Sequence, residues 1–157
     1  MGTVYNTNVV TDGLIACWDA GNRRSYPGTG TVWTDLVGGH DGTLENGVTL
    51  DNDNMGIMSF DGSDDHILIP DSDAFDFGTT GPFSISCWVK ANSAATGIYA
   101  YQCLFYHHWN PGVVVLICTP GGWEGEYQQV GFFGGSTVFE YGTSNINDNE
   151  WHYVAVT

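Results

Sequence analysis

The chain has 157 residues, of which 42% are hydrophobic, 14% aromatic and only 13% charged, together with 22 glycines. That length is enough for one domain that buries about 68–70% of the surface its unfolded chain exposes, so the core needs no metal or disulfide. Three basic side chains against 18 acidic ones give a formal net charge of -15, which repels phosphate backbones and anionic lipid and so argues against nucleic-acid and membrane-surface binding.

The acidity has three explanations: solubility, a saline environment and cation binding. Four cysteines lie far apart without a CxxC pair, which disfavours structural zinc and leaves two disulfides open. The start, MGTVYNTNVVTDG, lacks the basic region and the apolar region of a signal peptide. No apolar run approaches the ~20 residues of a membrane span. We therefore expect synthesis in a cytoplasm, or a piece cut from a larger secreted chain.

Short runs rich in Val, Ile, Phe, Trp and Tyr alternate with clusters of Gly, Asn, Asp and Pro along the whole chain. This pattern is typical of all-β proteins, and no helical period accompanies it. After an N-terminal arm (1–12), strands are expected at about 13–19, 43–50, 56–61, 65–69, 83–90, 101–106, 113–118, 128–133, 137–141 and 151–157. So many short strands around one core predict a two-sheet antiparallel sandwich over residues 13–157.

Two connections are candidates for function. Residues 20–42 hold both arginines and six glycines, and a connection of that length is usually functional or wrapped over the domain. The second, HHWNPG at 107–112, caps an expected hairpin with one tryptophan and two histidines. Adjacent strand residues point to opposite faces, so His107 and His108 are interpreted as surface histidines rather than ligands of one ion.

Catalysis is not expected. A retaining glycanase needs two carboxyl groups about 5–5.5 Å apart, and the best pair is Glu124 and Glu126 in WEGEYQQ. Gln129 stands where a third acid could tune their pKa, and glutamates on a Gly-rich loop are usually solvated. There is also no GxSxG nucleophile elbow.

Calcium is the metal to consider. DNDNMG at 51–56 begins like an EF-hand loop, but Met55 and Gly62 occupy positions that need ligands, so that match fails. Two turns, 60–66 and 70–76, are crowded with carboxylates: Asp61, Asp64, Asp65, Asp71, Asp73 and Asp76. Crowded acids repel unless they are solvated, hydrogen-bonded or neutralised by a cation. Because Asp is also an ordinary turn former, calcium and a plain turn both remain open.

Aromatic residues in expected loops are the candidate ligand-binding residues: Tyr26, Trp109, Trp123 and Tyr127. Flat rings there can stack on sugars or anchor a protein partner. The alternative for Tyr26, and the preferred interpretation for Trp33, is that the ring pins the long connection onto the sandwich.

Four ordered stretches together resemble the concanavalin A-like lectin/glucanase superfamily, specifically its laminin-G-like jelly-roll branch. They are GLIACWDAGNRRSYPGTGTVWTDLVGGHDGTLENG (13–47), SFDGSDDHILIP (59–70), FSISCWVKAN (83–92) and NDNEWHYVAVT (147–157). The resemblance implies a jelly-roll fold. It also implies a calcium site at the rim of the sandwich, with Asp64 and Asp65 as its ligands in this chain. The E-x-D-x-x-E strand of the superfamily's glucanases is reduced to E-x-E-x-x-Q at 124–129, which argues against hydrolysis.

The first stretch looks like the opening of such domains in tailed-phage structural proteins, especially those of marine and cyanobacterial phages. The resemblance therefore implies a non-enzymatic virion protein that decorates a capsid or belongs to a tail or fibre. Its expected partners are other virion proteins, host-surface glycans and further copies of itself within an assembly. The alternative is a carbohydrate-binding module of a secreted adhesin or polysaccharide-active enzyme; fold alone does not separate the two.

The last stretch, NEWHYVAVT, raises a separate expectation. Trp151, Tyr153 and Ala155 alternate with His152, Val154 and Val156, and a strand apolar on both faces belongs in the middle of a sheet. In the family that it resembles, this strand is central and further strands follow. We therefore expect a sandwich that lacks its last strands, completed either by residues beyond 157 or by a partner chain through strand addition.

Overall fold

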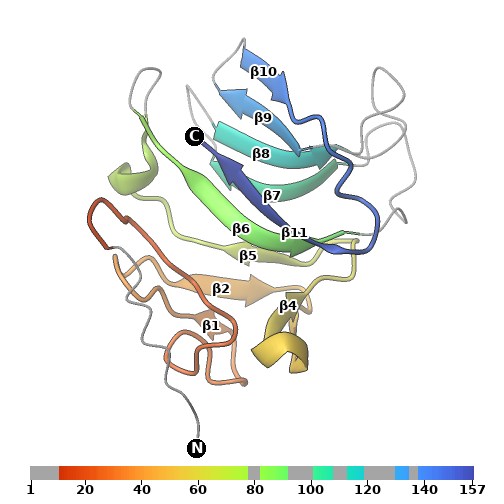
Figure 1. Cartoon of the computed structure of the whole chain (residues 1–157). Helices are drawn as coiled ribbons and strands as arrows, with labels where there is room; N and C mark the ends of the chain where they lie inside the picture. The colour runs from red at the N-terminus through yellow and green to blue at the C-terminus, as the bar shows by residue number, and fades with distance from the viewer. Residues whose placement is uncertain (1–10, 78–81, 92–100, 108–112, 119–129, 135–137) are drawn as a thin grey trace, which may run out of the picture. The chain divides into compact units, whose positions relative to one another are not determined.

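The computed structural model describes residues 11–77, 82–91, 101–107, 113–118, 130–134 and 138–157, and at 101–102, 113–118, 131–134 and 138–141 it describes the backbone alone. The described residues form strands and two short 3-10 helices with no α-helix among them, which confirms the all-β class. The chain divides into two compact units, Met1–Ala74 and Phe75–Thr157. Each unit has its own sheets (Figure 1) and its own buried cluster. A single domain over 13–157 stays a prediction.

The first unit contains a three-stranded antiparallel sheet and a hairpin. The sheet has the order β1-β2-β5, and the hairpin pairs β3 with β4 around the 3-10 helix η1. The bounds are β1 (Val32–Trp33), β2 (Gly42–Glu45), β3 (Thr49–Asp51), η1 (Asp53–Met55), β4 (Ile57–Ser59) and β5 (His66–Leu68). Tyr26, Leu44 and Val48 form its buried cluster, with Trp33, Leu50, Met58 and Ile67 packed against them.

Two strand predictions in this unit are wrong. Residues 13–19 form no strand, because the backbone there is bonded to the long connection: Cys17 donates its N–H to Asp35, and its carbonyl accepts the N–H of Leu36. The expected strand at 43–50 is two strands, β2 and β3. A turn at Asn46 and Gly47 separates them, with φ angles of 62° and 128°. Asn-Gly is a strong turn signal because both residues tolerate positive φ.

The long connection at 20–42 is an ordered structure built around one buried carboxylate. Asp35, 6% exposed, accepts backbone N–H groups from four residues: Cys17 (2.8 Å), Val37 (3.0 Å), Gly38 (2.9 Å) and His40 (3.0 Å). Burial raises the pKa of this carboxyl, but the four hydrogen bonds outweigh burial, so the pKa is lowered from its usual value. The carboxylate therefore stays ionised and cross-links residue 17 to residues 37–40.

Other side chains reinforce the same connection. Ser25 is fully buried; its hydroxyl donates to the carbonyl of Thr34 (2.6 Å) and accepts the N–H of Asp19 (3.1 Å). The hydroxyl of Tyr26 donates to the carbonyl of Gly30 (2.7 Å). These bonds satisfy polar groups that would otherwise be buried without partners.

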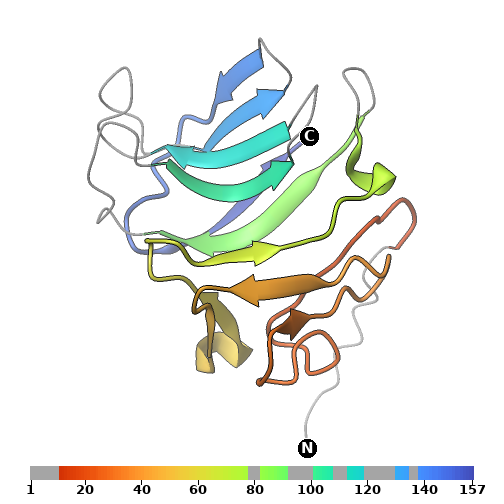
Figure 2. The same cartoon turned by 180° about the vertical axis from the view of Figure 1, so that it is seen from behind.

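The second unit contains a four-stranded antiparallel sheet of order β10-β9-β8-β7 (Figure 2) and a two-stranded ribbon of β6 and β11. The bounds are η2 (Asp73–Phe75, at the junction of the units), β6 (Ile85–Lys90), β7 (Tyr101–His107), β8 (Val113–Cys118), β9 (Val130–Gly134), β10 (Val138–Tyr141) and β11 (Trp151–Val156). These strands lie where the sequence predicts them, within one or two residues. A register shift interrupts β7 between Cys103 and Phe105.

The buried cluster of the second unit comprises Ala91, Ile146 and Val154, with Cys87, Val89, Leu104 and Val130 packed against it. Residues along β6 alternate between half-buried and exposed, as a strand with one covered face requires. Burial raises the pKa of the Cys87 thiol, so this cysteine behaves as a small hydrophobic residue, as the sequence predicts.

We expect Asp35→Asn to destabilise the protein by about 2–4 kcal/mol, because the amide nitrogen would face backbone N–H groups that the carboxylate now satisfies. Urea denaturation followed by circular dichroism measures the free energy of unfolding. Asp41→Asn is the matched control. Asp41 is exposed, its Oδ1 accepts the N–H of Asp35 (2.8 Å), and an asparagine oxygen can still accept it. A loss in Asp35→Asn no larger than that of the control would contradict the central role of Asp35.

The stability difference between the parent protein and Asp35→Asn should also depend on pH. The pKa of Asp35 is lower in the folded state than its usual value of 3.8, so the folded protein holds this carboxylate unprotonated more readily than the unfolded chain does. The contribution is therefore complete above pH ~4–5 and shrinks as the pH falls below 3.8 through the folded pKa. Denaturation of both proteins between pH 2 and 7 checks this; a difference that stays constant to pH 2 would contradict it.

Candidate functional site

The acidic turn between β4 and β5 is the candidate metal centre. Asp61 accepts the N–H of Ser63 on Oδ1 (2.7 Å) and donates its own N–H to Asp65 Oδ2 (2.9 Å). Gly62 lies between them with a φ of 77°, a conformation that favours glycine. The sequence D-G-S-D-D thus closes a tight turn and gathers its carboxylates on it.

The turn between β2 and β3 supports this acidic turn. The side-chain amide of Asn46 donates to the carbonyl of Asp64 (3.0 Å), and a ring nitrogen of His66 lies 2.9 Å from the same carbonyl. At Gly47, the next residue, a Cβ would lie 3.1 Å from Asp65 Oδ1. The absence of a side chain at Gly47 therefore lets the Asp65 carboxylate lie close against the backbone.

Three carboxylates converge on this turn. Asp61, Asp64 and Asp65 each offer one oxygen, and these oxygens all lie within 4.8 Å of one another. Asp65 Oδ1 is buried and has no hydrogen-bond partner in the described structure, whereas Asp61 and Asp64 are exposed. Hard carboxylate oxygens suit calcium, which takes six to eight oxygen ligands and accepts waters among them. The orphaned oxygen and the open side of the cluster fit such an ion.

The structure thus brings Asp64 and Asp65 together and adds Asp61, which the sequence placed in the same turn but not in the expected ligand pair. Calcium binding itself stays a prediction. The acids of the second turn are not part of this group: Asp76 Oδ1 lies 3.8 Å from His107 Nε2 instead. An acid-rich segment alone could not indicate which carboxylates would converge, because backbone turns decide that.

Of the predicted ligand-binding aromatics, Tyr26 is the one that the structure describes. Its ring is only 5% exposed and packs with Leu44 and Val48. No ligand could stack on a ring so covered, so Tyr26 has the structural role given above as its alternative. Trp109, Trp123 and Tyr127 lie outside the described residues, as do His108, Glu124 and Glu126.

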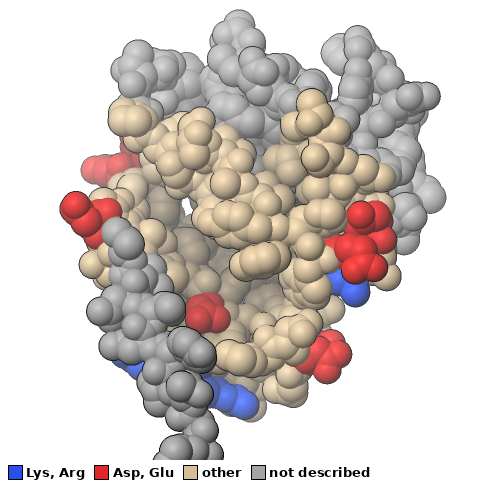
Figure 3. All heavy atoms as spheres, in the orientation of Figure 1, with Lys and Arg blue, Asp and Glu red and all other residues tan. Residues whose placement is uncertain are grey.

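An aromatic surface on the β6–β11 ribbon is a feature that sequence reasoning missed. Trp88 is 67% exposed, Tyr153 59% and Trp151 37%, although the strand 151–157 was expected to be covered on both faces. Figure 3 shows the surface over these two strands free of charge across most of its breadth. The signal was present in the sequence as Trp88 in one strand and as Trp151 and Tyr153 at alternate positions of the other, but alternation does not say which face a sheet covers.

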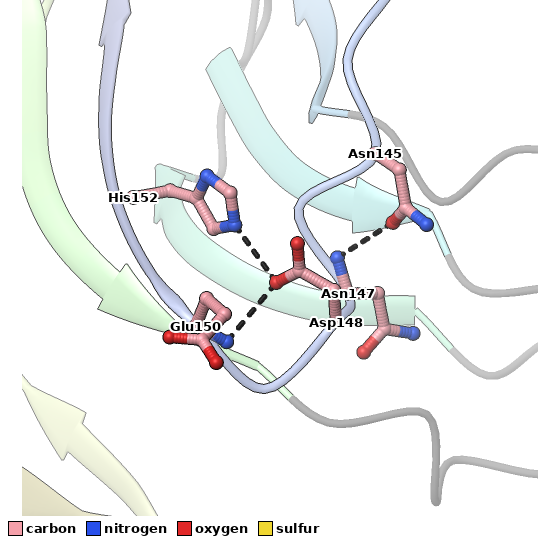
Figure 4. Close-up of polar contacts among 5 residues, drawn as sticks. All are labelled: Asn145, Asn147, Asp148, Glu150 and His152. Atoms are coloured by element: carbon pink, nitrogen blue, oxygen red, sulfur yellow. Dashed lines mark hydrogen bonds and ion pairs between the residues drawn. The ribbon is translucent and has the colours of Figure 1, made fainter.

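Polar side chains order the turn that leads into β11 (Figure 4). Asp148 Oδ1 accepts the N–H of Glu150 (3.0 Å) and lies 2.8 Å from His152 Nε2, while Asn145 Oδ1 accepts the N–H of Asn147 (2.9 Å). The hydrogen bond from His152 is the main cause that lowers the pKa of Asp148. Because each contact is local, this cluster positions the start of β11.

Comparison with known proteins identifies no relative: no family model, no curated protein and no solved structure matches this chain. Within the described ranges, no helix has the length and apolar character needed to cross a membrane.

Proposed function

We propose that this chain is a non-enzymatic surface domain of a virion, with a laminin-G-like jelly-roll sandwich that decorates a capsid or belongs to a tail or fibre. The ordered set of four sequence stretches carries the proposal. One observation of the fold supports it: residues 83–92 and 147–157, two of those stretches, contain β6 and β11. These strands pair antiparallel in unbroken register from Ile85↔Val156 to Lys90↔Trp151.

The composition agrees with a soluble surface domain that does not bind nucleic acid. A net charge of -15 keeps the domain soluble and away from the nucleic acid that it would help to enclose. Its partners are other virion proteins, further copies of itself and host-surface glycans. The exposed pair Trp88 and Tyr153 also favours the second candidate, a carbohydrate-binding module of a secreted adhesin or polysaccharide-active enzyme.

A calcium ion held by Asp61, Asp64 and Asp65 belongs to the same proposal. The ion would neutralise three crowded carboxylates of the β4–β5 turn, which the Asn46 amide already bonds to the neighbouring turn. Its role here is to stabilise the rim of the domain. The orphaned oxygen of Asp65 is the observation that supports it.

Calcium should therefore raise the thermal stability of the protein. At a concentration about 100 times its dissociation constant, an ion that binds only the folded state adds about 2.7 kcal/mol, or about 5–10 °C for a chain of this size. Differential scanning fluorimetry with about 10 mM CaCl₂ reaches that excess for a site of about 0.1 mM affinity.

Asp65→Asn should abolish most of the calcium effect, while Asp53→Asn, a change at an exposed acid outside the cluster, should leave it intact. No shift in the parent protein would contradict calcium binding. An equal shift in the parent protein and Asp65→Asn would place the ion elsewhere.

The virion assignment predicts an assembly. Particles purified from the native source should contain many copies of this chain by mass spectrometry, with density for it on the capsid or tail in cryo-electron microscopy. Neighbouring capsid or tail genes would agree with that result, whereas an upstream signal peptide would favour the secreted module. Recovery of the protein only as a free monomer would contradict the virion proposal.

A further inference from the structure

The outward face of the β6–β11 ribbon has an unusual composition for so acidic a chain. Its exposed residues are Ser86, Trp88, Lys90, Trp151, Tyr153 and Ala155. None of these carries a negative charge, and Lys90 is the one charged residue among them. Acidic side chains begin at the edge, with Asp148 and Glu150 in the turn before β11. In Figure 3 the surface over β6 and β11 is correspondingly free of charge across most of its breadth, with acidic groups beside the start of β11.

Trp88 and Tyr153 form the centre of this face. They are direct cross-strand partners, with ring centroids 5.4 Å apart and ring planes inclined by 54°. The two rings contact each other, yet both remain more than half exposed (67% and 59%). They therefore present two inclined aromatic rings to solvent, and Trp151 adds a third ring on the same face of β11 because side chains two residues apart share a side.

Polar groups flank the aromatic pair along β6. Ser86 and Lys90 lie two residues before and after Trp88, about 7 Å to either side on the same face. Their cross-strand partners are Ala155 and Trp151. A ligand lying along the ribbon would thus meet a hydroxyl, aromatic rings and an ammonium group in turn.

Charge and shape narrow the class of ligand. A net charge of -15 opposes anionic ligands, and a basic partner would seek the carboxylates that this face lacks. A purely apolar small molecule needs a concave site that covers most of its surface, whereas this is the open face of a two-stranded ribbon. A neutral ligand with both an apolar face and hydroxyl groups meets every condition.

We propose that the β6–β11 face binds a neutral glycan, with a pyranose ring stacked on Trp88 beside Tyr153 and hydroxyl groups along the glycan bonded to Ser86 and Lys90. The axial C–H groups of a sugar ring carry partial positive charge and are attracted to the negative face of an aromatic ring. The inference rests on the proposed surface-binding function and specifies the ligand class and the residues.

Isothermal titration calorimetry and tryptophan fluorescence with neutral hexasaccharides of β-1,4-glucan, xylan, mannan and chitin test this proposal on the full chain. At least one should bind, and polygalacturonate, an anionic glycan, should bind at least tenfold more weakly. Trp88→Ala and Tyr153→Ala should each lower the affinity at least tenfold, while Trp88→Phe should retain most of it because the π face is kept.

Tyr106→Ala is the matched control, since Tyr106 is an equally exposed tyrosine (58%) on a different strand, β7. It should leave the affinity unchanged, and circular dichroism should report the same fold for all variants. The substituted rings are largely solvated, so unfolding is not expected.

Three results would overturn the proposal. One is no binding of any neutral hexasaccharide by the parent protein. The second is binding that Trp88→Ala and Tyr153→Ala leave intact, which places the sugar elsewhere. The third is a dimer by light scattering that Trp88→Ala converts to a monomer without any glycan affinity, which assigns the face to a second copy. None of these three results bears on whether purified particles contain the protein. The glycan proposal can therefore fail while the virion proposal stands, and the reverse.

Discussion

The buried carboxylate of Asp35 is the interaction on which the first unit depends. It replaces water with four backbone N–H groups, and this exchange makes burial of a charge tolerable. The backbone N–H of Asp35 donates to the carboxylate of Asp41, which immediately precedes β2. The start of β2 is thereby fixed, and four residues later the chain reaches the Asn46–Gly47 turn against which Asp64 and Asp65 lie. One carboxylate in a long connection thus anchors a series of contacts that ends at the candidate metal centre.

Backbone N–H groups, more than basic side chains, stabilise the acids of this chain. With three Lys and Arg for 18 acids, ion pairs could neutralise few of them. Asp19, Asp51, Asp61 and Asp148 instead accept the N–H of the residue two positions later, at 2.7–3.0 Å. This local turn suits Asp, because its short side chain reaches the second N–H without distorting the backbone. Asp65 Oδ1 is the one buried carboxylate oxygen of the described residues that accepts no hydrogen bond.

The sequence predicts the positions of most strands well, but it predicts their tertiary contacts poorly. Apolar runs bounded by turn residues locate β4 to β11, because a strand and its turns are local. The run at 13–19 looks equally strand-like, but its backbone groups are engaged by residues 35 and 36, a contact that no local pattern reveals. The acidic turn was predicted from its Asp content, whereas the convergence of Asp61 with Asp64 and Asp65 depends on positive φ at Gly62.

Tyr26 and Tyr153 show why the candidate ligand residues could not be ranked from sequence. Tyr26 lies in a connection and was expected at the surface, but the bonds around Asp35 and Ser25 fold that connection inward and bury its ring. Tyr153 lies in an apolar strand and was expected to be covered, yet it is exposed. A connection and a strand are both defined locally, whereas burial is decided by what packs on them.

In β6 and β11 the residues on the covered face are not the largest ones. The apolar area that could be buried therefore does not by itself determine which face of the ribbon is covered. The inward residues are Ile85, Cys87, Val89, His152, Val154 and Val156, whereas the outward set holds two tryptophans and a tyrosine. A shift of one residue would bury the larger rings, but it would also bury Lys90 and Ser86 without partners. Trp88 and Tyr153 are consequently left in solvent as a contacting pair, on a face where this acidic chain shows aromatic rings in place of carboxylates.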